Sequence, residues 1–372
     1  MGKPVAVACI SMTPHIVPPV VSRPMNDAAV SDGLRPVRNW LMTGAVMIAL
    51  MVVIGGITRL TESGLSITEW KPVTGALPPL SEAAWQEEFE RYKQIPEYQL
   101  VNNTMDLAGF KRIYFWEWLH RNWGRLMGVV FAVPFFIFWR RGLLKGWLMK
   151  RSIAIMIGGG LVGALGWYMV SSGLSQNTDV SHYRLAIHLC AAFTVFAMVL
   201  WTWFDLKKDR RTVAPESSIG RWARAILVVL AVQIIWGAFT AGLDAGRIYN
   251  TWPLMNGEFM PENVHAFNNV VKDFTDHKDG VQFVHRNLAY VVALAVFLFA
   301  LLPKHPAQLV RPNLWMLGMV LVQFTLGILT LVWQVPILLG VLHQFGAVLL
   351  LAAVLNVMHR TGKPISATPA SA

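Results

Sequence analysis

Four histidines lie inside long apolar segments of this 372-residue sequence: His120, His188, His285 and His343. Each lies about one and a half to two helical turns, or about 8–11 Å, from one end of its segment. An ionisable side chain within a membrane is costly unless it is paired, solvated or bound to a metal. A single such histidine is as readily explained by a hydrogen bond between helices, but four at one depth predict ligands.

The residues around these histidines favour haem over a bare metal ion. No set of cysteines or carboxylates in the apolar segments completes a four-ligand site, whereas two axial histidines per iron fit haem. Arginines lie within about a turn of the histidines, where they could bind haem propionates as bidentate donors. These arginines are Arg121, Arg125, Arg184 and Arg286. The alternative is that they only extend to the membrane surface.

The surroundings of the histidines differ at one position. Glu117 precedes His120 by three residues and shares its helix face, whereas Gln282 holds the matching place before His285. A carboxylate at one site only predicts proton-coupled chemistry there and electron transfer at the other. The alternative is a structural Glu117, hydrogen-bonded to a ring nitrogen or to Arg121.

The composition is that of a membrane protein, with 55% hydrophobic and 14% charged residues. A helix of about 20 apolar residues crosses the roughly 30 Å of hydrocarbon in a bilayer. Eight such segments are predicted, at 40–60, 114–139, 152–171, 183–204, 222–243, 281–302, 312–332 and 338–358. The predicted fold class is an all-α integral membrane protein, surrounded by lipid.

The net charge of +11 does not indicate nucleic-acid binding, because lysine and arginine concentrate in alternate connections between the apolar segments. By the positive-inside rule these connections and both termini are cytoplasmic. The first 35 residues lack the features of a signal or transit peptide, so we expect a bacterial cell inner membrane. Cys9 falls in the cytoplasmic tail and Cys190 within a span, and no disulfide is expected.

The connections on the outer side alternate in length, and this pattern predicts an internal repeat. Long connections at 61–113 and 244–280 alternate with short ones at 172–182 and 333–337. Four spans return the chain to its starting side, so we expect two pseudo-symmetric four-helix bundles, each with one histidine pair. The predicted parts are a tail at 1–39, halves at 40–204 and 222–359, a linker at 205–221 and a tail at 360–372.

Several motifs, in order along nearly the whole chain, resemble the haem A synthase family, which makes the haem of aa3-type cytochrome oxidases. They are Gly55–Ser66 (GGITRLTESGLS), Trp70-Lys71-Pro72, Glu117–Arg121 (EWLHR), Ala241–Gly246 (AGLDAG) and Tyr249–Met255 (YNTWPLM). The resemblance implies oxidation of the C8 methyl of haem O to a formyl group by successive hydroxylations, which gives haem A.

The resemblance also assigns the histidine pairs. It implies that His285 and His343 bind the iron of a resident haem b, and that His120 and His188 belong to the iron of the substrate haem. Glu117 matches a functionally important carboxylate of the family. Some bacterial members carry a cysteine pair in the first outer loop, but 61–113 contains none, so the chain resembles the cysteine-free branch of proteobacterial and mitochondrial members.

Two other functions are compatible with paired histidines in a helix bundle. One is a dihaem electron-transfer cytochrome of b561 type, which requires no substrate pocket. The other is a haem transporter or chaperone, which would exchange haem unchanged. Direct contact with haem O synthase is an expectation, and the electron-transfer partner, the oxygen source, homo-oligomerisation and the number of ligands on the substrate iron are left open.

Overall fold

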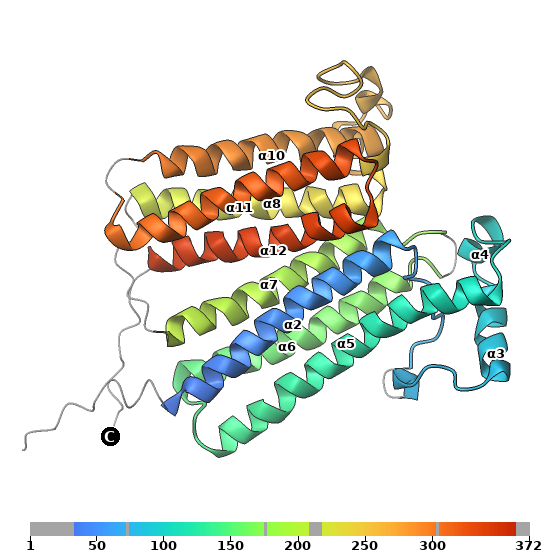
Figure 1. Ribbon diagram of the computed structural model, residues 1–372, viewed down its shortest axis with the longest axis horizontal. Helices are drawn as coiled ribbons and strands as arrows, with labels where there is room; N and C mark the ends of the chain where they lie inside the picture. Colours follow the sequence, from blue (N-terminus) through green and yellow to red (C-terminus); the bar gives the residue numbers. More distant parts are fainter. Residues whose placement is uncertain (1–32, 72–73, 175–176, 208–217, 303–304, 362–372) are drawn as a thin grey trace, which may run out of the picture.

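The computed structural model describes residues 33–71, 74–174, 177–207, 218–302 and 305–361. Within these ranges the regular secondary structure is helical, apart from one isolated β-bridge between Met255 and Glu258. Eight long helices form the body of the molecule (Figure 1). They are α2 (Arg35–Leu60), α5 (Leu107–Arg140), α6 (Gly146–Val170), α7 (His182–Leu206), α8 (Ser218–Gly242), α10 (Lys278–Ala300), α11 (Ala307–Val332) and α12 (Ile337–Arg360).

All eight long helices are apolar and long enough to cross a membrane. Even the shortest, α10, has 23 residues, and a helix of that length exceeds the roughly 30 Å of hydrocarbon. The eight predicted spans are therefore confirmed. The chain is a multi-pass membrane protein.

Helix α5 extends furthest beyond its predicted span. It begins at Leu107, where the sequence predicted a start at 114, because Asp106 caps it by accepting a hydrogen bond from the backbone nitrogen of Gly109 at 2.7 Å. The extra turns project beyond the neighbouring helices at the end of the bundle that carries the long loops (Figure 1). This overhang supports part of the first loop.

The long helices form two groups in chain order, with α2, α5, α6 and α7 in one and α8, α10, α11 and α12 in the other (Figure 1). Helix α2 packs against α7 within its group and against α12 of the second group, and α7 packs against α8. In the most apolar 18-residue stretch of α2, 50% is buried inside the molecule, whereas the share for α6 is 6%. Helix α2 is therefore central and α6 is peripheral. One hydrophobic core, including Leu41, Val199 and Val354, joins the groups. Their pseudo-symmetry stays a prediction.

The first described helix begins and the last one ends at the same end of the bundle, opposite the long loops (Figure 1). Cys190 lies in α7. Most of the predicted tails at 1–39 and 360–372, most of the linker at 205–221, and Cys9 lie outside the described residues. The predicted domain boundaries therefore stay predictions.

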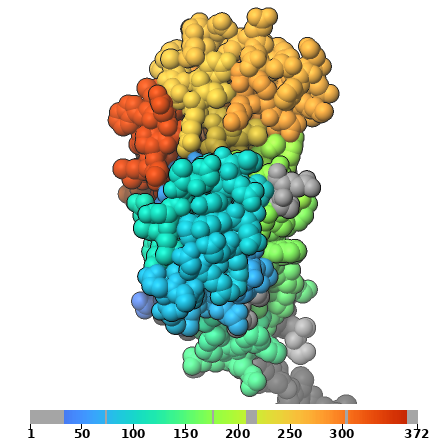
Figure 2. All heavy atoms as spheres, turned by 90° about the vertical axis from the view of Figure 1, so that its right-hand side faces the viewer, coloured from blue at the N-terminus to red at the C-terminus, as the bar shows by residue number. Residues whose placement is uncertain are grey.

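The two long loops contain short helices of their own. The first holds η1 (Thr74–Ala76), α3 (Glu82–Tyr92) and α4 (Pro96–Leu100), and the second holds η2 (Ala245–Arg247), η3 (Glu262–His265) and α9 (Val270–Thr275). Viewed from this end of the bundle, they form two neighbouring caps, one blue to teal and one yellow to orange (Figure 2). We call the first long loop, with its short helices, the first cap, and the second long loop, with its short helices, the second cap.

A buried polar network joins the two groups at the opposite end. His359 Nε2 of α12 lies 2.8 Å from Asp205 Oδ1 of α7, and Arg151 of α6 donates to the other oxygen of the same carboxylate. The side chains of His359 and Asp205 are each only 2% exposed. A buried carboxylate is tolerated when it is paired in this way, and removing one partner leaves the other uncompensated.

Replacing Asp205 with alanine should therefore lower the free energy of unfolding by about 3 kcal/mol. The expected observation is a lower midpoint of thermal unfolding in detergent. Glu87→Ala, which removes an exposed ion pair with Arg91, is the control and should change stability by at most about 0.5 kcal/mol. Equal midpoints for the two variants would show that the network does not hold the groups together.

Candidate functional site

The four predicted histidines lie near the end of the bundle that carries the caps. His188, His285 and His343 come one to two turns after the first residues of α7, α10 and α12, at 182, 278 and 337. His120 lies further along α5 because that helix starts in the overhang. All four side chains are partly exposed within an otherwise apolar bundle.

The C-terminal pair consists of two imidazoles that face one another. The ring centroids of His285 and His343 lie 6.4 Å apart, and the ring planes are perpendicular at 90°. Gln323 of α11 places its Nε2 3.2 Å from His343 Nδ1. His285 Nδ1 is buried without a hydrogen-bond partner among the described residues.

The N-terminal pair shows how one histidine is prepared as a ligand. His188 Nδ1 lies 3.1 Å from the carbonyl oxygen of Val162 on α6. Because a carbonyl only accepts, this nitrogen carries the proton, and Nε2 keeps the lone pair that a metal requires. His120 Nδ1 is buried without a partner in the described part of the chain.

Glu117 is almost fully buried, with 3% of its surface exposed. Its Oε2 accepts hydrogen bonds from Ser66 Oγ at 2.8 Å and from the backbone nitrogen of Ile67 at 2.7 Å. Its Oε1 accepts from Arg121 Nη2 at 2.6 Å. Three donors therefore surround this one carboxylate. The bond to Arg121 is the structural alternative raised by the sequence, and the described hydrogen bonds of Glu117 do not include His120.

The helix that carries His120 holds the first cap in place. Arg121 donates to the carbonyl oxygens of Ile67 at 2.7 Å and Glu69 at 3.1 Å. Arg125 donates to Lys71, and Trp118 and Asn122 both donate to Ala76, always at a carbonyl oxygen. The backbone of the first cap is therefore fixed by side chains from the turns around His120.

The helix that carries His285 holds the second cap in the same way. Arg286 Nη2 donates to the carbonyl oxygen of Thr251 at 2.6 Å, and Gln282 Nε2 donates to that of Tyr249 at 3.2 Å. Asp279 Oδ2 accepts from the Tyr249 hydroxyl at 2.8 Å and from Asn263 Nδ2 at 2.7 Å. The matching positions 117 and 282 therefore both bind a cap, but Glu117 accepts where Gln282 donates.

A cavity of about 320 Å³ lies between the first cap and α5. Its lining includes Ile67 and Arg121, two of the three residues that bind Glu117 directly, together with Arg125 and carboxylates such as Glu69 and Glu88. Polar space therefore reaches the immediate neighbours of the buried carboxylate.

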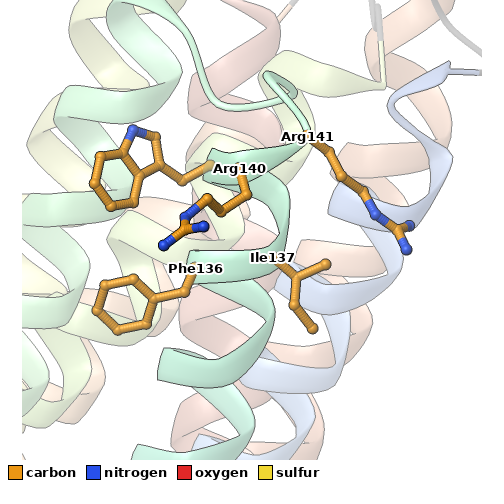
Figure 3. A pocket seen from close by; sticks show the side chains of 5 residues that line it. Phe136, Ile137, Arg140 and Arg141 are labelled. Atoms are coloured by element: carbon orange, nitrogen blue, oxygen red, sulfur yellow. The ribbon is translucent and has the colours of Figure 1, made fainter.

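A larger surface cleft, of about 480 Å³, lies at the opposite end of α5. Phe136 and Arg140 extend on one side of the helix there, and Ile137 and Arg141 on the other (Figure 3). Its lining contains neither histidine nor carboxylate. Aromatic and basic side chains of this kind are typical of a helix end at the membrane surface, so this cleft is not the candidate site.

The four predicted arginines all lie near the caps, and each donates to a backbone carbonyl. Arg184 donates to the carbonyl oxygen of Tyr168 at 2.8 Å and lies over its ring. Arg286 differs in one respect, because its Nη1 is buried and has no partner among the described residues. That nitrogen is a free donor for an anionic group such as a propionate.

Comparison with known proteins identifies the family of this chain. The profile of the cytochrome oxidase assembly protein family COX15-CtaA matches residues 38–355. The chain belongs to this family. Its relatives named heme A synthase include those of Flavobacterium johnsoniae (46% identity, 87% of this chain and 97% of the relative), Parvibaculum lavamentivorans (46%, 87% and 94%) and Rhodospirillum centenum (48%, 87% and 88%).

The C-terminal pair of this COX15-CtaA chain fits a haem iron. Two imidazoles that ligate one metal ion through bonds of about 2 Å have ring centroids about 6 Å apart, close to the 6.4 Å between His285 and His343. The Nη1 of Arg286, which has no hydrogen-bond partner among the described residues, supplies a hydrogen-bond donor in the same turn of α10 as His285. At the N-terminal pair, the Nδ1 contact of His188 leaves the lone pair of its Nε2 available to a metal.

The sequence analysis missed a second buried carboxylate, Glu97 in the first cap, which is 6% exposed. The hydroxyl of Tyr92 donates to its Oε2 at 3.1 Å, and Asn102 donates to that hydroxyl at 2.8 Å. Burial raises the pKa of Glu97 to about 8, with a smaller contribution from the negative charge of Glu117. Its loop position carried no periodic signal that could have identified it.

The raised pKa of Glu97 predicts that the first cap loses stability as the pH rises. The protonated carboxyl stabilises the folded cap fully below about pH 4.5, the ordinary value, and this stabilisation is lost as the pH rises through about 8. Between pH 6 and 8 the loss is about 2 kcal/mol. Hydrogen exchange of the cap should therefore speed up over this range.

In Glu97→Gln the neutral side chain should make that exchange insensitive to pH, once the intrinsic chemical rate is corrected for. Glu90→Gln, at an exposed carboxylate of the same cap, should behave like the wild type. The same pH dependence in Glu97→Gln and in the wild type would exclude Glu97 as its source.

Proposed function

We propose that this chain is a haem A synthase, a membrane oxidoreductase that oxidises the C8 methyl of haem O to a formyl group by successive hydroxylations. Family membership over residues 38–355 supports the reaction class. The observation that carries the assignment is the pair of capped histidine sites, of which only the first has a carboxylate three residues before its first histidine: Glu117 is buried there and binds its cap, whereas Gln282 holds the matching place at the second. A cytochrome that only transfers electrons does not require that difference between its two sites.

We infer that His285 and His343 hold a resident haem b. That haem supplies one-electron transfer when it is bound. The residues of the chain position it: α10 and α12 supply the imidazoles, Gln323 orients one ring, and Arg286 offers its free Nη1 to a propionate. The second cap covers this site and limits its contact with water.

In the same proposal His120 and His188 hold the substrate haem, and Glu117 exchanges protons during its oxidation. The methyl group loses hydrogen as it becomes formyl, so the site needs a group that can take up protons. Glu117 is the buried carboxylate nearest in sequence to a ligand, and its partners Ile67 and Arg121 line the cavity beside the first cap. That cavity gives protons a polar route outwards.

The proposed setting is the inner membrane of a bacterial cell, with both termini in the cytoplasm. The support is the concentration of basic residues in alternate connections and the location of both described ends opposite the caps. The caps and the four histidines then lie at the outer side. Haem O, a product of haem O synthase, is the proposed substrate, and direct contact with that enzyme is part of the proposal.

The haem extracted from the purified chain, expressed with and without haem O synthase, tests the function. A haem A synthase yields haem b alone without the supply, and hydroxylated and formyl haem with it. A transporter or chaperone would return haem O unchanged. A cytochrome of b561 type would contain haem b under both conditions, and either of these results would overturn the proposal.

Glu117→Gln should lower the conversion of haem O by about 100-fold, the usual scale for loss of a general acid–base group. The bound haem b should keep its spectrum, because Glu117 belongs to the other site. Glu82→Gln makes the same change at a carboxylate that is 78% exposed in the first cap and should convert haem O normally. Full conversion by Glu117→Gln would show that this carboxylate does not handle protons.

A further inference from the structure

Each of the four histidines packs against a glycine on the long helix that precedes its own. In the N-terminal group, a Cβ built on Gly55 of α2 would lie 3.0 Å from His120 Cε1, and one on Gly166 of α6 would lie 3.0 Å from His188 Cε1. In the C-terminal group, the distances are 3.1 Å from Gly237 of α8 to His285 and 2.9 Å from Gly327 of α11 to His343.

These distances are shorter than the contact distance of about 3.5–4.0 Å between carbon atoms. Any larger residue at the four glycines would therefore press on the edge of an imidazole ring. Each glycine lies about one turn before the end of its helix, at the same end as the caps. The four helix pairs thus repeat one local arrangement, a glycine opposite a ring.

Other glycines on the same helices have open surroundings. Gly163 on α6 and Gly318 on α11 have no atom within 4 Å of an added Cβ. Both are exposed on the outside of the bundle. Gly163 and Gly318 therefore differ from Gly166 and Gly327 on the same helices, where an added Cβ would meet a histidine ring.

In two of the four couples, the helix that carries the glycine also contacts the Nδ1 edge of the ring. Val162, whose carbonyl lies 3.1 Å from His188 Nδ1, comes one turn before Gly166. Gln323, whose Nε2 lies 3.2 Å from His343 Nδ1, comes one turn before Gly327. In these two couples one helix therefore contacts the ring both at Nδ1 and at Cε1.

We propose that Gly55, Gly166, Gly237 and Gly327 are positioning residues that set the depth and the ring plane of the four haem-ligating histidines. This inference rests on the proposed haem sites and adds to them a determinant of the haem electronic structure. The angle between two axial imidazole planes changes the splitting of the iron orbitals, and ligand orientation is one of the means by which a protein tunes a haem. Here the two C-terminal planes are at 90°.

The test at the C-terminal site compares Gly327→Ala with Gly318→Ala in the full-length protein loaded with haem b. Both changes add one methyl to α11, but only the first meets a ring. Gly327→Ala should shift the low-spin ferric electron paramagnetic resonance signal and the midpoint potential, and should weaken haem retention by about 10-fold. Gly318→Ala should match the wild type in all three.

Gly237→Ala provides an independent test, because it presses on the other ligand of the same haem through a slightly longer contact. It should shift the same signal and potential, and it decides the matter if Gly327→Ala does not fold. Wild-type signals and potentials in the folded variants would overturn the proposal and leave the haem A synthase assignment intact. A wild-type protein without haem b would instead overturn the proposed function itself.

The N-terminal site gives a second comparison, between Gly166→Ala and Gly163→Ala on α6. Gly166→Ala should slow the conversion of haem O by about 10-fold and leave the signal and potential of haem b unchanged, since that haem is held by other helices. Gly163→Ala should leave the conversion of haem O and the signal and potential of haem b unchanged. A change in haem b with unaltered conversion in Gly166→Ala would contradict a local effect on His188.

Discussion

The structure depends on the cost of placing imidazoles in an apolar helix bundle. A polar group within a membrane needs a partner, and water cannot supply one there. Near the caps, His188 lies beside a carbonyl oxygen and His343 beside a glutamine, whereas the Nδ1 atoms of His120 and His285 have no hydrogen-bond partner among the described residues. At the opposite end of the bundle, the buried imidazole of His359 is paired with Asp205.

The two caps are anchored on helices that also carry the rings. Their backbone carbonyls are bound by side chains of α5 and α10, the helices that carry the first histidine of each pair. A displacement of α5 or α10 is therefore transmitted directly to the cap that its side chains bind. Glu117 and Gln282 show how one position can keep this mechanical role while differing in charge: the first accepts from the cap backbone, and the second donates to it.

The sequence predicted the helices well because membrane spans depend on length and apolar content, which are local properties. It also singled out His120 and Glu117 from their spacing, and their roles stay predictions. The partners of Glu117 could not be predicted, since Ser66 and Ile67 belong to a loop without periodicity. Nor could the arginine contacts, because a guanidinium can bind a propionate or a carbonyl equally well, and only the path of the caps decides between them.

The division of each histidine pair between two helical hairpins has a consequence for synthesis. The first site needs α5 and α7, so it cannot exist until the fourth span has left the ribosome and entered the membrane. Helix α2 also buries part of its surface against α12, the last span to be made. The first helix to be made therefore lacks this neighbour until translation ends, and the order of translation sets the order in which the two proposed haem sites can form.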